Sequence, residues 1–180
     1  MKYLKYYIST LTLIVAIYTC FLGENYPTIF FIGFSLFIII GDIIVKKDDV
    51  EQEYSKPYLL DIPMYLNFFL LSIIVFCSVF ILSDSAPGVF VSGISNYFNT
   101  ELLEARASIN YIDSISLVAL TGLFIGIMGT VPGHELAHRK KNKFDMFMGN
   151  WLLALSWDCA FAAEHVHGHH KNVGLTSDPA

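Results

Sequence analysis

Four long apolar stretches, separated by short polar segments, dominate the first three quarters of the chain. They run Tyr6–Leu22, Pro27–Val45, Met64–Leu82 and Asp113–Val131. A helix needs roughly 20 apolar residues to cross ~30 Å of hydrocarbon, since it rises ~1.5 Å per residue. Each stretch comes close to that length, so the pattern predicts four transmembrane helices. The polar sequence GENY between the first two stretches predicts a tight hairpin turn.

A further apolar segment, FDMFMGNWLLALSWDCAFAAEH, follows the fourth stretch. Its large apolar side chains recur at helical spacing, but Asn150, Ser156 and Asp158 interrupt its other faces. By length it could form a fifth span. It connects two groups of histidines, however, and a spanning helix would place them on opposite sides of the membrane. If the two groups share one site, this segment lies along the membrane interface or re-enters.

Small residues and a proline mark the fourth stretch. Gly122 and Gly126 form a G-x-x-x-G pattern, a spacing that lets membrane helices approach closely. Pro132 and Gly133 interrupt the pattern just before the first histidine. A bend is expected at that point because proline cannot continue the helical hydrogen bonds.

The composition agrees with this pattern and narrows the class. Of the 180 residues, 54% are hydrophobic, and the mean hydropathy is +0.54. A soluble domain of this size needs more polar surface. The formal net charge of −5 comes from short clusters between the apolar stretches, and no basic face suited to nucleic acid is present. The sequence predicts one all-α membrane domain over residues 1–180, with membrane lipids as partners and no nucleic acid.

The basic residues predict how the chain is oriented. If the N-terminus is cytoplasmic, ten of the eleven Lys and Arg residues lie on the cytoplasmic side and only Arg106 lies outside. Basic residues near the ends of spans favour the cytoplasm. The N-terminus and the histidine-rich region are therefore expected at the cytoplasmic face.

All six histidines fall between positions 134 and 170. In HELAH, His134 and His138 are four residues apart, and His165 and His169 repeat that spacing with His170 beside them. Residues four apart stack on one face of a helix, so two imidazoles can reach one metal ion. Ionisable groups near a membrane are also costly, which indicates a function. The pattern predicts a metal site.

Two metal chemistries fit these residues. A zinc protease would use His134 and His138 as ligands, Glu135 as general base and Glu164 as a third ligand. That reading leaves three imidazoles unused. An all-imidazole set of this size fits a pair of irons better, because imidazole suits iron and open positions can hold dioxygen.

The two histidine clusters together resemble a known family. HELAHRK followed by EHVHGHHKNVGLTSDPA is similar to the first two histidine boxes of the membrane alkane hydroxylases (alkane 1-monooxygenases) and the related xylene monooxygenases. Their pattern reads roughly H-E-L-x-H-K/R, then E-H-x-x-G-H-H-x-x-V, with D-P-A shortly after. The match covers Val131–Ala180, and the preceding spans match only in hydropathy. Membrane fatty-acid desaturases share the wider fold, but their second box usually lacks this form.

The resemblance implies an oxidoreductase with two non-haem Fe ions, which hydroxylates a terminal C–H bond of an alkane or similar apolar substrate with dioxygen. It implies electrons from a rubredoxin- or ferredoxin-type donor and a bacterial inner membrane. Glu135 and Glu164 become candidates for carboxylates that orient the imidazoles. Asp178 is expected in a turn, and His167 falls at a variable position of the box. The ligands carried over from the family are His134, His138, His165, His169 and His170.

The family has a third histidine box, which this chain lacks. We therefore expect the chain to be the N-terminal part of a longer enzyme. The alternatives are a fatty-acid desaturase of the same fold, a membrane zinc protease built on His134, Glu135 and His138, and an inactive fragment.

Overall fold

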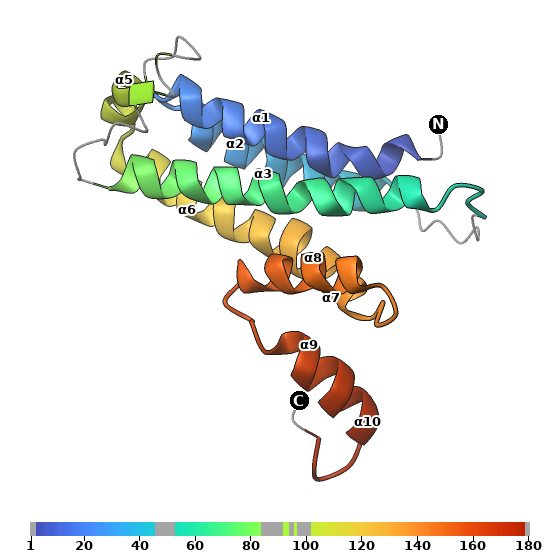
Figure 1. Ribbon diagram of the computed structural model, residues 1–180. Helices are drawn as coiled ribbons and strands as arrows, with labels where there is room; N and C mark the ends of the chain where they lie inside the picture. Colours follow the sequence, from blue (N-terminus) through green and yellow to red (C-terminus); the bar gives the residue numbers. More distant parts are fainter. Residues whose placement is uncertain (1–2, 46–52, 84–91, 94–95, 97–101, 179–180) are drawn as a thin grey trace. The chain divides into compact units, whose positions relative to one another are not determined.

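A computed structural model describes residues 3–45, 53–83, 92–93, 96 and 102–178. Every regular element in these ranges is a helix (Figure 1). Among the described residues, four helical stretches are long and apolar enough to cross a membrane: Leu4–Leu22, Tyr26–Ile44, Tyr58–Leu82 and Tyr111–Ala137. The prediction of an all-α protein with four membrane spans is confirmed. The third span begins six residues earlier than expected, and the fourth ends six residues later.

Shorter helices form parts of the spans or lie between and after them in the sequence. The first span consists of η1 (Leu4–Tyr7) and α1 (Ile8–Leu22), the second of α2 (Tyr26–Ile44), the third of α3 (Tyr58–Leu82), and the fourth of α6 (Tyr111–Phe124), the π-helix η2 (Ile125–Thr130) and α7 (Val131–Ala137). The remaining helices are α5 (Leu102–Ser108), α8 (Lys143–Ala154), α9 (Phe161–Ala163), the π-helix η3 (Glu164–His169) and α10 (His170–Asn172). Three of the ten basic residues counted above as cytoplasmic, Lys2, Lys46 and Lys47, lie outside the described residues, as do Pro179 and Ala180 of the second box.

The chain forms two compact units. The first contains Met1–Thr10, Tyr58–Ser72 and Gly122–Ala180, and the second contains Leu11–Pro57 and Ile73–Thr121. Both histidine clusters belong to the first unit. The expectation of a single domain over residues 1–180 stays a prediction.

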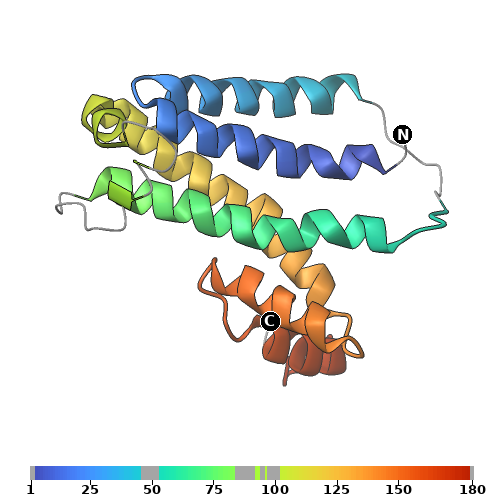
Figure 2. The same cartoon turned by 45° about the horizontal axis from the view of Figure 1, so that its top comes forward.

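In the second unit, α1 and α2 form a hairpin around Gly23 (Figure 2). Gly23 has a φ of +67°, and a Cβ there would lie 2.4 Å from the Ser108 Oγ and 2.7 Å from the Ala105 Cα. The Ser108 hydroxyl also accepts a hydrogen bond from the Glu24 N–H at 2.7 Å. Glycine is needed here because it tolerates positive φ and leaves room for the neighbouring backbone. The tight turn predicted from GENY is confirmed.

Polar side chains inside the second unit are paired. The Asn110 Oδ1 accepts from the Asp113 N–H at 3.1 Å, and the Asp113 Oδ2 accepts from the Asn110 N–H at 3.2 Å. This reciprocal pair is a capping box that begins α6. Thr28 donates to the same carboxylate, which is 1% exposed. Polar groups in apolar surroundings are costly when unpaired, so these bonds make the buried Asp113 tolerable.

Two prolines lie inside the spans of the first unit, and each is compensated in the same way. In an α-helix the residue at Pro63 would donate to the Leu59 carbonyl; that carbonyl instead accepts from the Tyr7 hydroxyl at 2.9 Å. The Met128 carbonyl, four residues before Pro132, accepts from the Asn67 amide at 3.0 Å. A freed carbonyl in a membrane needs such a partner. These side chains let both spans continue through residues that the sequence marks as breaks.

Helix α8 packs against α7 through two glycines. A Cβ on Gly149 would lie 2.9 Å from the Gly133 carbonyl oxygen and 3.0 Å from the Ala137 nitrogen. A Cβ on Gly122 or Gly126 would meet no atom within 4 Å in the described part of the chain. The close approach expected at Gly122 and Gly126 is therefore wrong. At Gly129, the third glycine of this stretch, a Cβ would lie 3.2 Å from the Leu71 side chain. The closest approach of two backbones occurs at Gly133, about two to three turns after Gly126 and Gly122.

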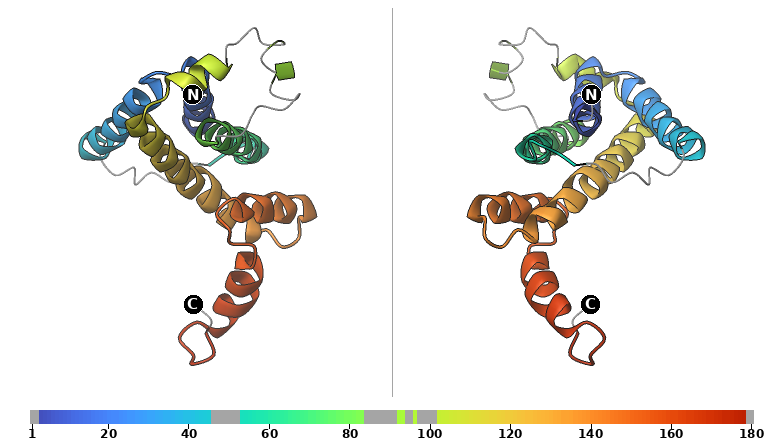
Figure 3. Two further views of the ribbon diagram at one scale, coloured as in Figure 1. Left: turned by 90° about the vertical axis from the view of Figure 1, so that its left-hand side faces the viewer. Right: turned by 90° about the vertical axis from the view of Figure 1, so that its right-hand side faces the viewer.

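Helix α8 is too short to cross a membrane and ends in a reversal. Its 12 residues span ~18 Å. The Trp157 N–H donates to the Ala154 carbonyl and the Asp158 N–H to the Leu153 carbonyl, around a φ of +63° at Trp157. This pattern is a Schellman motif, with tryptophan where glycine is usual. The chain then continues into α9 and the second histidine cluster (Figure 3).

Candidate metal centre

The first histidine pair lies on α7 and at its end. Pro132 lies in the first turn of this helix, which continues directly from η2, and the Asn67 amide compensates for its missing N–H. Leu136 and Ala137 are fully buried, while the His134 and His138 side chains are half-buried. The spacing of four residues therefore gives α7 two imidazoles on one face, as the sequence predicts.

The second cluster lies on the π-helix η3 and the first residue of α10. In an α-helix each residue turns by about 100°, so His170 would point ~140° away from His165. A π-helix has a wider turn and pairs residues five apart. His165 and His170 consequently share a face, and their Nε2 atoms are 3.1 Å apart. The sequence shows the spacing of these residues but not the wider turn.

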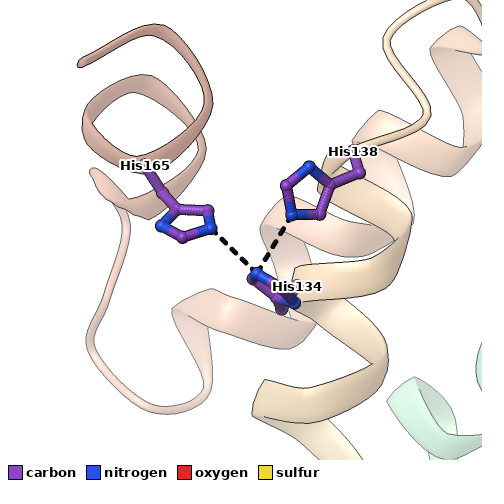
Figure 4. Close-up of side chains that lie close together, drawn as sticks. All are labelled: His134, His138 and His165. Atoms are coloured by element: carbon purple, nitrogen blue, oxygen red, sulfur yellow. Dashed lines mark hydrogen bonds between the residues drawn. The ribbon is translucent and has the colours of Figure 1, made fainter. Parts of the chain in front are cut away.

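The two clusters meet at their ring nitrogens (Figure 4). The His134 Nε2 lies 2.9 Å from the His165 Nε2 and 3.0 Å from the His138 Nε2. These three side chains form a group whose ligand atoms all lie within 4.8 Å of one another. Residues 31 positions apart in sequence thus present one set of donors. The segment between them returns to the same site, as expected if both clusters share it.

His170 extends this group, and His169 lies at its edge. The His170 ring centroid is 4.8 Å from that of His138, in addition to its Nε2 contact with His165. The His169 ring stacks on His165 with centroids 5.3 Å apart. Its Nδ1 is bonded elsewhere, to the Asp178 carboxylate at 2.9 Å. The structure therefore brings together all five histidines that the sequence identifies.

Apolar side chains and one lysine hold the second cluster against the first. Phe161 stacks on His165 with centroids 4.6 Å apart and contacts His134 edge-on at 5.5 Å. A small core of Ala137, Leu153, Ala162 and Val166 lies beneath. The Lys140 ammonium donates to the Val166 carbonyl at 3.3 Å. These contacts join α7, α8 and η3.

The surroundings favour neutral imidazoles. Burial lowers the pKa of His138, and the neighbouring His134 and His170 lower it further. Burial also lowers the pKa of His165, with His134 and His170 adding to the effect. A lowered pKa keeps an imidazole uncharged near neutral pH, which is the form that binds a metal.

Arg139, next to His138, ties this region to the third span. Its guanidinium donates to Asp61 of α3 at 2.7 Å and lies 3.5 Å from both Asp145 of α8 and Glu135. Asp145 is 3% exposed and also accepts from the Tyr65 hydroxyl. The network fixes the end of α7 relative to α3 and α8.

The two glutamates of the boxes lie at the surface. The Glu135 side chain is 59% exposed and faces Arg139, and Glu164 is an exposed residue at the start of η3. Within the described residues, neither forms a hydrogen bond to a histidine. The role assigned to them from the sequence stays a prediction. The carboxylate that does contact a box histidine is Asp178.

The donor set fits a metal ion. Two nitrogens bound ~2.1 Å from one ion at a right angle lie ~3.0 Å apart. The Nε2 separations of 2.9, 3.0 and 3.1 Å match that value. Such close neutral nitrogens gain at most one hydrogen bond per pair, whereas an ion would satisfy all of them. The cluster can hold a metal.

Comparison with known proteins identifies similar enzymes. An alkane 1-monooxygenase of Pseudomonas putida is 36% identical over 73 residues, which are 41% of this chain and 18% of that protein. Alkane 1-monooxygenase 1 of Alcanivorax borkumensis and an alkane 1-monooxygenase of Ectopseudomonas oleovorans are each 39% identical over 67 residues. The chain is similar to alkane 1-monooxygenases. No family model matches it, and no solved structure is significantly similar.

The matched region spans only part of each alkane 1-monooxygenase, 15% of the length of the latter two. The resemblance expected from the histidine boxes is nevertheless confirmed by these relatives. The sequence alone did not identify Phe161 or the bond between His169 and Asp178. The D-P-A that ends the box pattern was a signal for Asp178, but its contact depends on how the chain turns after α10. No sequence signal marked Phe161.

Proposed function

We propose that this chain is part of an integral-membrane monooxygenase that hydroxylates a terminal C–H bond of an alkane or similar apolar substrate. The convergence of box histidines from α7, η3 and α10, with Nε2 atoms ~3 Å apart, is the observation that carries the proposal. The similarity to alkane 1-monooxygenases supports the same chemistry.

The proposed cofactor is a pair of non-haem irons, which would supply the oxidising power for a strong C–H bond. His134, His138, His165, His169 and His170 would hold it. Phe161 would keep water from one side of the donor set, since its ring covers His165 and the edge of His134. The full-length protein is expected to supply the remaining donors from a third histidine box.

The substrate and the electron donor would approach from different directions. The apolar spans offer a route for a hydrocarbon dissolved in the membrane. We place the histidine boxes at the cytoplasmic face of a bacterial inner membrane, where a rubredoxin- or ferredoxin-type donor would dock. Lys140, Lys141 and Lys143 are exposed beside the first box and would attract an acidic donor. They also fit a positive-inside anchor.

Iron content and product together test this proposal. The purified full-length protein should contain about two irons per chain, and with an alkane, dioxygen and a reduced donor it should form a primary alcohol. His134→Ala should lose most of the iron and the activity. His167→Ala is the control, because His167 is a histidine of the second box that is exposed and lies outside the nitrogen cluster. It should retain both.

Other outcomes identify the alternatives. A double bond in the product, in place of an alcohol, would indicate a desaturase. Zinc alone in the purified protein would contradict the proposal. A protease would also need Glu135 as general base, so loss of peptide cleavage in Glu135→Gln with metal retained would establish that reading. The exposed pairing of Glu135 with Arg139 does not favour it.

A further inference from the structure

We propose that Asp178 is a positioning residue that orients His169 for metal binding. This inference rests on the proposed metal centre and adds a residue to it. Asp178 lies nine positions after His169 and outside both histidine clusters. From the sequence alone, Asp178 is expected only in a turn.

The contact between the two side chains is close and shielded. The His169 Nδ1 lies 2.9 Å from one Asp178 carboxylate oxygen and 3.1 Å from the other. The Asp178 side chain is 12% exposed and that of His169 is 30% exposed. A carboxylate can only accept, so the imidazole carries its proton on Nδ1 and donates it. The Nε2 lone pair is then free for a metal, on the ring that stacks against His165.

Two successive turns bring Asp178 to this position. The Leu175 N–H donates to the Asn172 carbonyl at 2.8 Å, with Val173 at φ −48° and ψ 123° and Gly174 at φ +77°. These angles define a type II turn, which requires a residue that accepts positive φ at the Gly174 position. The Asp178 N–H then donates to the Leu175 carbonyl at 3.1 Å.

The start of the reversal is also fixed. The Asn172 side-chain amide donates to the Gly168 carbonyl at 2.9 Å, which anchors the first turn to η3. The chain end in Figure 3 accordingly runs back along the helix that carries the second box. Gly174 permits the type II turn and Asn172 anchors its start. The chain reversal that results places the Asp178 carboxylate against His169.

Carboxylates in this position have a defined effect on metal sites. They fix the tautomer and the ring orientation of a histidine and make its free nitrogen more basic. Removing such a partner typically lowers metal affinity 10- to 100-fold. Neither Glu135 nor Glu164 has this geometry. Asp178 therefore performs the role of orienting an imidazole, which the sequence predicts for the two glutamates.

The test measures the affinity of the full-length protein for ferrous iron by competition with a chelator. Asp178→Asn keeps the shape and one acceptor oxygen but removes the charge, so we expect affinity to fall by roughly 10- to 100-fold. Asp178→Glu keeps the charge and should recover part of that loss. Asp158→Asn removes a carboxylate from the loop before α9 and should bind iron like the wild type. The melting temperature of each metal-free variant is measured in parallel.

The outcomes separate this inference from the proposed function. If the wild type binds no iron, the metal centre itself is wrong. If the wild type binds iron and Asp178→Asn binds it equally well, the metal centre stands and the role of Asp178 is overturned. A purely structural role predicts lower melting temperatures for Asp178→Asn and Asp178→Glu alike, with no recovery of affinity in the latter. That result would also overturn the inference.

Discussion

Gly149 lies where α8 touches the backbone of α7, and even a methyl group there would collide with the Gly133 carbonyl. We expect Gly149→Ala to destabilise the protein by ~1–3 kcal/mol, because overpacking forces the two helices apart. Since α7 carries His134 and His138, the variant should also lose part of its iron. Thermal melting and iron analysis of the purified full-length protein measure both effects.

Gly122→Ala is the control for that substitution. A Cβ at Gly122 meets no described atom within 4 Å, and Gly122 lies in the α-helical part of the fourth span. Alanine is favoured over glycine in a helix by ~0.5–1 kcal/mol, so this variant should melt at the same temperature or slightly higher. Equal losses of stability and iron in both variants would show that the close contact between Gly133 and Gly149 is not the cause of these losses.

For single residues of the candidate site, the sequence predicted some positions well and others not at all. The five box histidines could be identified from spacing and family resemblance, and they do lie together. The residues that contact those histidines could not be identified in this way. Asp178 and Phe161 reach the site through a turn and a loop whose direction depends on positive φ at Gly174 and Trp157. Positive φ is expected of glycine but not of tryptophan.

At the level of whole helices, the two spans that contain a proline differ most from the prediction. Hydropathy located all four spans. The predicted start of the third span and the predicted end of the fourth were wrong, because the helices continue through Pro63 and Pro132. The side chains that compensate these prolines come from other helices, so no local pattern reveals them. Asn67 and Tyr7 are separated from the prolines they serve by 65 and 56 residues. The same separation in sequence explains why the continuation of both spans through their prolines could not be predicted.

The link between Asn67 and Pro132 can be tested by a double-mutant cycle. Asn67→Ala should lower the free energy of unfolding by ~1–3 kcal/mol, because the Met128 carbonyl loses its donor in a buried position. In a Pro132→Ala background the backbone regains an N–H, and the same substitution should cost clearly less. Denaturation of the four purified proteins in detergent measures the coupling. Additive effects would mean that the amide and the proline act independently.

At the scale of the whole molecule, a metal would join segments that otherwise share few contacts. The segment from Phe161 to Asp178 is held to α7 and α8 by a small apolar core and the Lys140 bond. At 100 times its Kd, a ligand stabilises the form that binds it by ~2.7 kcal/mol. Metal removal should therefore loosen this segment more than other parts of the chain.

Limited proteolysis measures that difference. Lys171 lies in α10 beside the ligands and is exposed, and Lys5 is an exposed lysine in the short helix η1. We expect a chelator to speed trypsin cleavage at Lys171 and to leave cleavage at Lys5 unchanged, with restoration when ferrous iron is added back. Equal acceleration at both sites would indicate general unfolding, and no change would indicate that the metal does not hold this segment.

The π-helical turn of η3 gives the second box an unusual sensitivity to length. A π-turn contains one residue more than the α-turn it replaces, so loss of one residue between His165 and His170 would restore an ordinary helix. Deletion of Val166, His167 or Gly168 would remove none of the five proposed ligands, yet it would bring His169 and His170 one position closer to His165 in the sequence. In the lineage of this protein, changes in length are therefore expected in the loop of residues 155–160 and not within the box itself.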